Sequence, residues 1–208
     1  GTYSGYAAAA SPAGGLSSLI SGSKWNTVGD DGAGTDNLSY SYWDGASPHA
    51  YTRTGTRTTL DSHSTGSNNT TAHNAVFEEW DSVSAIDLVQ VNEDGDGDPV
   101  GDIRVQVLSE MPAGAAAYAF YPSSSPQGGD VYYGSAMMGS ATDTDFVQGT
   151  YNWVTGLHEV GHALGLSHPF DGGSADSSTL NLNLDSQRNT VMTYVQTDRN
   201  VLISNNSG

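Results

Sequence analysis

Three histidines and one glutamate fall within a single stretch, His158-Glu159-Val160-Gly161-His162-Ala163-Leu164-Gly165-Leu166-Ser167-His168. Histidines four residues apart lie one turn above each other on the same face of a helix, so His158 and His162 can both reach one metal ion. Glu159 follows the first histidine, where its carboxylate can reach a water held by that metal. Three histidines with an open fourth position are typical of a catalytic zinc site.

Gly165 explains how the third histidine, His168, would reach the same metal. Glycine can end a helix in a left-handed turn at little steric cost, and the chain then doubles back. The alternative is an ordinary helix with coincidental histidines, since a lone H-E-x-x-H also arises by chance. The continuation through Gly165 and His168, with Met192 downstream, disfavours that alternative.

The pattern H-E-x-x-H-x-x-G-x-x-H resembles that of the metzincin zinc endopeptidases. Pro169 after the third histidine is similar to the serralysins, which are secreted bacterial proteases, and residues 191–194 resemble their Met-turn. In that family the methionine lies beneath the zinc, and the tyrosine two residues later can ligate it. The resemblance therefore implies these roles for Met192 and Tyr194.

The resemblance implies a zinc-dependent endopeptidase that hydrolyses internal peptide bonds. His158, His162 and His168 would hold Zn²⁺, with Glu159 as general base. Tyr194 would be a further zinc ligand and would hydrogen-bond the oxyanion during turnover. Two alternatives stay open: a catalytically impaired zinc- or peptide-binding module of the same fold, and a metal hydrolase with a non-peptide substrate. The presence of Glu159 disfavours the first, and the metzincin extension disfavours the second.

Two helices are expected to position these residues. The active-site helix should begin within residues 145–150 and run to about Leu164. A backing helix should span Thr71 to about Asp81, with His73 on its surface. Its apolar face would pack on a sheet through Val76, Phe77 and Trp80. The fold class is α+β: a metzincin-type zinc protease domain in which a twisted mixed β-sheet packs on both helices, with a Met-turn below the zinc.

Strands are expected at residues 38–43, 85–91, 103–107, 115–121 and 128–133. The strand at 103–107 alternates apolar and polar residues, which predicts burial on one face only. In metzincins the strand before the active-site helix borders the cleft and pairs with an extended peptide. The resemblance thus implies substrate contacts at Ala115, Ala116, Ala117 and Tyr118. The alternative is that these small side chains only pack tightly.

Two segments are candidates for Ca²⁺. Asp94, Asp96 and Asp98 alternate as at the start of an EF-hand loop, but Val105 stands where such a loop needs its bidentate glutamate. A looser calcium site and a solvated hairpin tip both stay open there.

The second calcium candidate resembles a serralysin Gly-Asp-Val segment and comprises Gly128, Gly129 and Asp130. Matrix metalloproteinases place a histidine for a second zinc two residues after the equivalent aspartate. Here that position holds Tyr132, so only one zinc is expected.

Charge and composition bound the partners. With 208 residues, one catalytic domain over 1–208 is the default. The chain has 23 acidic and 6 basic residues and a formal charge of −17, so nucleic acid and anionic membranes would be repelled. We expect a monomer that acts on protein or peptide substrates. Cysteine is absent, so no disulfide supports the fold.

The ends of the chain carry further expectations. The resemblance to the serralysins implies a secreted, extracellular, bacterial-type protein. Residues 1–15 lack the basic start and apolar run of a signal peptide, so the chain would then be the mature form. The acidic surface fits a salty habitat or simple solubility. Neither G-G-x-G-x-D repeats nor a helix after the Met-turn is seen, so the chain would be a fragment, a processed form or a shortened relative without the calcium-binding β-roll.

Overall fold

The computed structural model describes residues 16–25, 36–47, 55–63, 69–95, 99–138, 146–172, 177–181 and 184–195. The chain divides into two compact units. The first comprises Gly1–Ala7 and Ser23–Gly165, and the second comprises Ala8–Gly22 and Leu166–Gly208. The prediction of a single domain over 1–208 stays a prediction.

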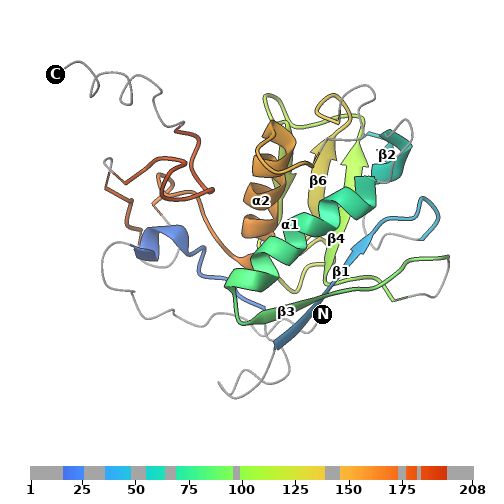
Figure 1. Cartoon of the computed structure of the whole chain (residues 1–208), viewed down its shortest axis with the longest axis horizontal. Coiled ribbons are helices and arrows are strands. Elements are labelled where there is room, and N and C mark those ends of the chain that lie inside the picture. The colour runs from blue at the N-terminus through green and yellow to red at the C-terminus, as the bar shows by residue number, and fades with distance from the viewer. Residues whose placement is uncertain are drawn as a thin grey trace. The chain divides into compact units, whose positions relative to one another are not determined.

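A mixed sheet of six strands forms the centre of the first unit (Figure 1). The strand order is β3-β1-β4-β6-β5, and β2 pairs with β4 off this path. Neighbours among β3, β1, β4 and β6 run parallel, whereas β5 is antiparallel to β6 and β2 to β4. The strands are β1 (Asp36–Tyr42), β2 (Arg57–Thr58), β3 (Ile86–Gln90), β4 (Ile103–Leu108), β5 (Ala117–Ala119) and β6 (Val131–Gly134). The expected mixed sheet is therefore present, with strand ends shifted by a few residues.

Both expected helices are present, as α1 (Asn69–Val83) and α2 (Tyr151–Leu164), and they lie side by side on one face of the sheet (Figure 1). The ring of Phe77 on α1 stacks on Tyr40 of β1 with centroids 3.8 Å apart. At Gly156 of α2, an added Cβ would lie 3.0 Å from Val76 Cγ2, so glycine permits the close approach of the two helices. Within the described ranges, no helix is long and apolar enough to cross a membrane.

Strand β4 is buried on both faces, which corrects the expected half-exposed strand. Ile103, Val105 and Val107 belong to the core beneath the helices. On the opposite face, Arg104 forms a buried ion pair with Glu93, and Gln106 donates to Asp130. A central strand with parallel neighbours on each side is commonly covered on both faces. The polar side chains of β4 are therefore buried and bind other polar side chains instead of water.

The described part of the second unit begins with a short 3₁₀ helix, η1 (Leu16–Leu19). Ile20 forms an isolated antiparallel bridge with Leu166. Next to it, the Ser167 backbone N–H donates to Leu19 O at 2.9 Å, and Ser167 Oγ donates to Ser18 O at 2.9 Å. These bonds join the two chain segments of this unit.

Candidate metal centre

Helix α2 carries the first half of the histidine motif and has a well-defined cap at each end. Thr150 caps its start, with Oγ1 accepting the Trp153 N–H at 3.2 Å. Gly165 follows its end in the left-handed conformation at φ 107°, and its N–H bonds to carbonyls of the last turn. An added Cβ at Gly165 would lie 2.5 Å from Ser23 O. The expected helix and its glycine stop are confirmed.

His158 and His162 lie together on the buried side of α2, each 6% exposed. Their Nε2 atoms are 3.1 Å apart, and their rings meet edge-to-face with centroids 4.7 Å apart. Two nitrogens bound to one tetrahedral zinc at about 2.05 Å would be about 3.3 Å apart. The observed separation is close to that value, so this histidine pair fits a shared metal ion.

Glu159, which follows His158 on α2, is also buried, and its Oε2 atom lacks any hydrogen-bond partner among the described residues. Burial raises the pKa of its carboxyl to about 8. An unpaired buried carboxylate is costly, so such a group is usually retained for a ligand, an ion or a reaction. Neutral imidazoles and a carboxylate beside them are donors that suit zinc chemistry. The donor set therefore fits a zinc ion.

A buried aromatic network behind α2 was not foreseen from the sequence. His73 is fully buried, not on the surface of α1 as expected, and burial lowers its pKa to about 3. Its ring nitrogens bond to Tyr42 OH at 3.0 Å and Tyr133 OH at 2.7 Å. Burial, with Glu159 as a further cause, raises the pKa of Tyr133. The network therefore interacts electrostatically with Glu159, the predicted general base.

The remaining motif residues lie in the second unit. Tyr194 OH is 2.8 Å from His168 Nε2, so the structure brings these two predicted ligands together. Met192 is buried at 1% exposure, and Thr193 donates to Asp185. Asp171, which sequence reasoning did not single out, contacts His168 Nδ1 at 2.6 Å. Only its three-residue spacing from a histidine could have drawn attention to it.

The predicted substrate strand is shorter than expected, since β5 covers only Ala117–Ala119. It ends the strand order among the described strands. Gly134 N–H donates to Ala116 O, and Phe120 N–H donates to Asp130 O, so these positions direct backbone groups toward β6. Ala115 lies in the preceding turn, where its N–H donates to Pro112 O.

Those calcium candidates that the structure describes belong to no group of side chains that could share an ion. Asp130 is 3% exposed and accepts from Tyr132 OH at 2.9 Å and from Gln106. Gly129 adopts φ +81° beside Trp25, and Gly128 packs on Ser123. Asp96 and Asp98 lie outside the described residues. Across the described ranges, no group of three carboxylates is close enough to share an ion, so calcium is not supported.

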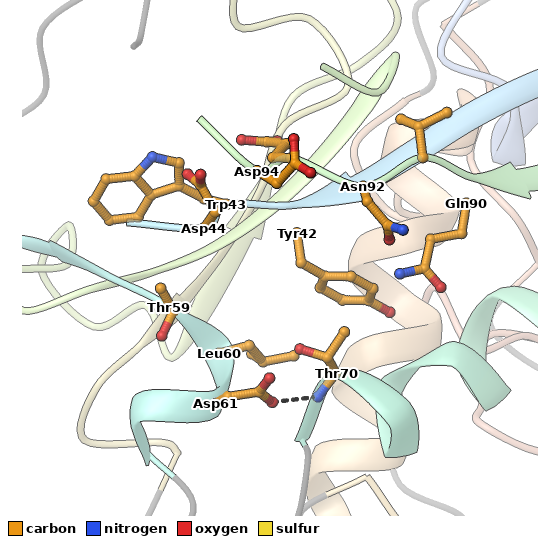
Figure 2. Close-up of a pocket in the computed structure, with 12 residues that line it drawn as sticks. Tyr42, Trp43, Asp44, Thr59, Leu60, Asp61, Thr70, Gln90, Asn92 and Asp94 are labelled. Carbon is orange, nitrogen blue, oxygen red and sulfur yellow. Dashed lines mark hydrogen bonds between the residues drawn. The ribbon is translucent and has the colours of Figure 1, made fainter. Parts of the chain in front are cut away.

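An acidic pocket of about 490 Å³ lies where β1 and β3 end and α1 begins (Figure 2). Its lining includes Asp44, Asp61 and Asp94, together with Trp43. Asp44 accepts the backbone N–H groups of residues 46 and 47, and Asp61 accepts that of Thr70. At least two of these carboxylates therefore stabilise local turns and the start of α1, and the predicted catalytic residues lie elsewhere.

Paired histidines with a buried glutamate on one helix are typical of metal-dependent hydrolase centres. Residues 121–208 match the family model of the metallo-peptidase family M12B, reprolysin-like. The matched part begins at Tyr121, whose ring packs 5.5 Å from that of His162, and includes all of α2. No curated protein matches the chain. The match and the histidine pair support a metzincin-type zinc protease; the serralysin subfamily stays a prediction.

Proposed function

We propose that this protein is a zinc-dependent endopeptidase that cleaves internal bonds of extended protein or peptide substrates. The observation that carries the proposal is the buried, unpaired Oε2 of Glu159, on the same helix as two histidines whose Nε2 atoms are 3.1 Å apart. A non-catalytic zinc module has no need to bury an unpartnered carboxylate at this position. The glutamate therefore favours catalysis over the alternative of an impaired binding module.

His158, His162 and His168 are the proposed ligands of one zinc ion. His168 follows Gly165 by three residues, a span of at most about 11 Å, so the chain keeps it near the end of α2. We propose Tyr194 as a further ligand of the resting site and Met192 as the Met-turn residue below it. Pro169 and Tyr194 together favour a serralysin-like type within the metzincins.

A bound zinc ion supplies Lewis acidity and lowers the pKa of water at the site. Glu159 accepts the proton of the attacking water and passes it to the leaving amine. Its low-dielectric surroundings favour holding a proton, which suits the transfer. Tyr194 donates a hydrogen bond to the oxyanion that forms from the scissile carbonyl.

The outer edge of β5 is the proposed position of the substrate backbone. Ala116 and Phe120 bond toward β6, so by alternation along the strand the backbone groups of Ala117 and Ala119 face the open edge. An extended peptide would add here as a further strand. The side chains of Ala117 and Ala119 pack against the core. The proposal therefore concerns the backbone groups of these residues, and substrate contact at the small residues stays a prediction.

The surroundings of the protein are also part of the proposal. The formal charge of −17 and the absence of cysteine fit a secreted, extracellular, monomeric enzyme. We expect about one zinc ion per chain, whereas calcium finds no support among the described residues.

The test is Glu159→Gln, with Glu79→Gln as a matched control on the exposed face of α1. Casein hydrolysis and zinc content by plasma emission are measured for both variants. We expect Glu159→Gln to lose turnover and keep zinc, because the residue acts on water and not on the metal. The control should behave as wild type, and chelator should stop its activity.

Three outcomes would contradict the proposal. Near-normal hydrolysis by Glu159→Gln would remove the general base. Loss of zinc in that variant would make the residue structural. A zinc-loaded wild type that cleaves no protein substrate, but hydrolyses a small ester, would favour the non-peptide hydrolase.

A further inference from the structure

The imidazole of His168 is contacted on three sides by residues of its own unit. Asp171 Oδ2 lies 2.6 Å from Nδ1, and Tyr194 OH lies 2.8 Å from Nε2. The ring of Phe170 stacks on the imidazole with centroids 4.9 Å apart and planes inclined by only 8°. Contacts at both nitrogens and one face leave the ring little freedom to rotate.

A tight turn places Asp171 beside the histidine. Residues 169–172 form the turn, with Pro169 near its start and Gly172 at φ +73°. Leu180 N–H donates to Pro169 O at 2.8 Å and anchors the turn from the returning chain. The three-residue spacing therefore brings the carboxylate back to the plane of the ring.

These contacts determine which nitrogen carries the proton. An ionised carboxylate can only accept hydrogen bonds, so Nδ1 must donate to Asp171. In a neutral imidazole Nε2 then keeps its lone pair, and the Tyr194 hydroxyl donates to it. The ring thus presents Nε2, and not Nδ1, on the side away from Asp171.

We propose that Asp171 is a positioning residue that fixes the tautomer and orientation of His168 for metal binding, with Phe170 restraining the ring from its face. The inference rests on the proposed function, because it takes His168 as the third zinc ligand. When a carboxylate that holds a metal-binding histidine in this way is removed, the metal affinity commonly falls by about 10- to 100-fold.

A purely structural role is the competing interpretation, because the Asp171 side chain is 51% exposed and also belongs to a turn. The two roles differ in what they change. A turn stabiliser alters thermal unfolding and leaves zinc affinity alone. A positioning residue alters zinc affinity and the protonation pattern of the histidine.

The experiment measures zinc dissociation constants of the purified chain by competition with a chromogenic chelator. Asp171→Ala should weaken zinc binding by about 10- to 100-fold. Asp171→Asn should lose less, because its amide oxygen can still accept from Nδ1. Glu79→Ala is the control for removal of one exposed carboxylate and should match wild type. Histidine-selective nitrogen NMR of the metal-free protein should show Nδ1 of His168 protonated in wild type and a tautomer mixture in Asp171→Ala.

Wild-type zinc affinity in Asp171→Ala and unchanged nitrogen shifts would overturn the inference. If Asp171→Ala fails to fold, Asp171→Ser, whose shorter side chain keeps a polar turn residue but does not reach Nδ1, decides by the same two measurements. His168→Ala separates the two proposals. If it weakens zinc binding while Asp171→Ala does not, only the positioning role fails. If it binds zinc as wild type does, the third ligand is wrong and both fail.

Discussion

Replacement of Asp130 by asparagine should change how the stability of the fold depends on pH. Asp130 precedes β6 and is buried, with Tyr132 OH and Gln106 Nε2 both donating to its Oδ2. Burial raises the pKa of its carboxyl from 3.8 to about 7, although the Tyr132 hydrogen bond acts in the opposite direction. Asparagine keeps the shape and an acceptor oxygen but has no ionisation.

The expected magnitude follows from the shift of the pKa. The shift is about three pH units, and each unit corresponds to 1.36 kcal/mol, so the full effect is at most about 4 kcal/mol. The folded protein holds the proton more tightly than the unfolded chain. Its stabilising contribution is complete below pH 3.8 and is lost as the pH rises through about 7. Above that pH the contribution stays constant.

The assay is urea unfolding at fixed zinc concentration between pH 4 and pH 8, with wild type and Asp130→Asn measured side by side. The free energy of unfolding of the variant, relative to wild type, should rise by up to about 4 kcal/mol from pH 4 to pH 7 and then level off. Zinc effects are common to both proteins and cancel in the difference. Glu79→Gln, an exposed carboxylate, should give a flat difference. An equally flat difference for Asp130→Asn would refute the reasoning.

Two further predictions address the proposed oxyanion donor and one buried glycine. Tyr194→Phe should lower kcat by about ten- to several-hundred-fold with little change in KM and with zinc retained. An unaltered kcat would remove the tyrosine from the mechanism. Gly129→Ala should reduce the free energy of unfolding by about 1–3 kcal/mol more than Gly114→Ala. Both glycines have φ near +80°, but only at Gly129 would the new Cβ lie 2.4 Å from Trp25. If both variants lose the same free energy of unfolding, Trp25 moves away from the new methyl group and the predicted clash is wrong.

The two helices and most strands were predictable because their signals are local. The H-E-x-x-H spacing and Gly165 define α2 and its end, and Val76 and Phe77 define the inward face of α1. Burial of the second face of β4 was not predictable. The partner of Arg104 is Glu93, which lies beyond the end of β3, and no periodicity within one strand encodes such a partner.

The residues of the candidate site also fall into a predictable and an unpredictable group. His158, Glu159 and His162 follow from a motif on one helix, whereas the burial of His73 depends on tyrosines from two separate strands. Asp171 lies in a turn, where no repeating pattern marks a functional residue. Sequence reasoning therefore finds groups placed by local geometry and misses those placed by tertiary contacts.

The parallel order of the sheet has a consequence for how the chain reaches its native state. β1 pairs with β3 across the whole of α1, and β1 pairs with β4 across an even longer segment. Each of these pairings must close a large loop before any strand–strand hydrogen bond is gained, and folds rich in such non-local pairs assemble slowly. The β5–β6 pair closes the shortest loop among the paired strands. Until both β3 and β4 have docked, β1 keeps at least one open edge, and in a chain without cysteine no disulfide can bring these segments together earlier.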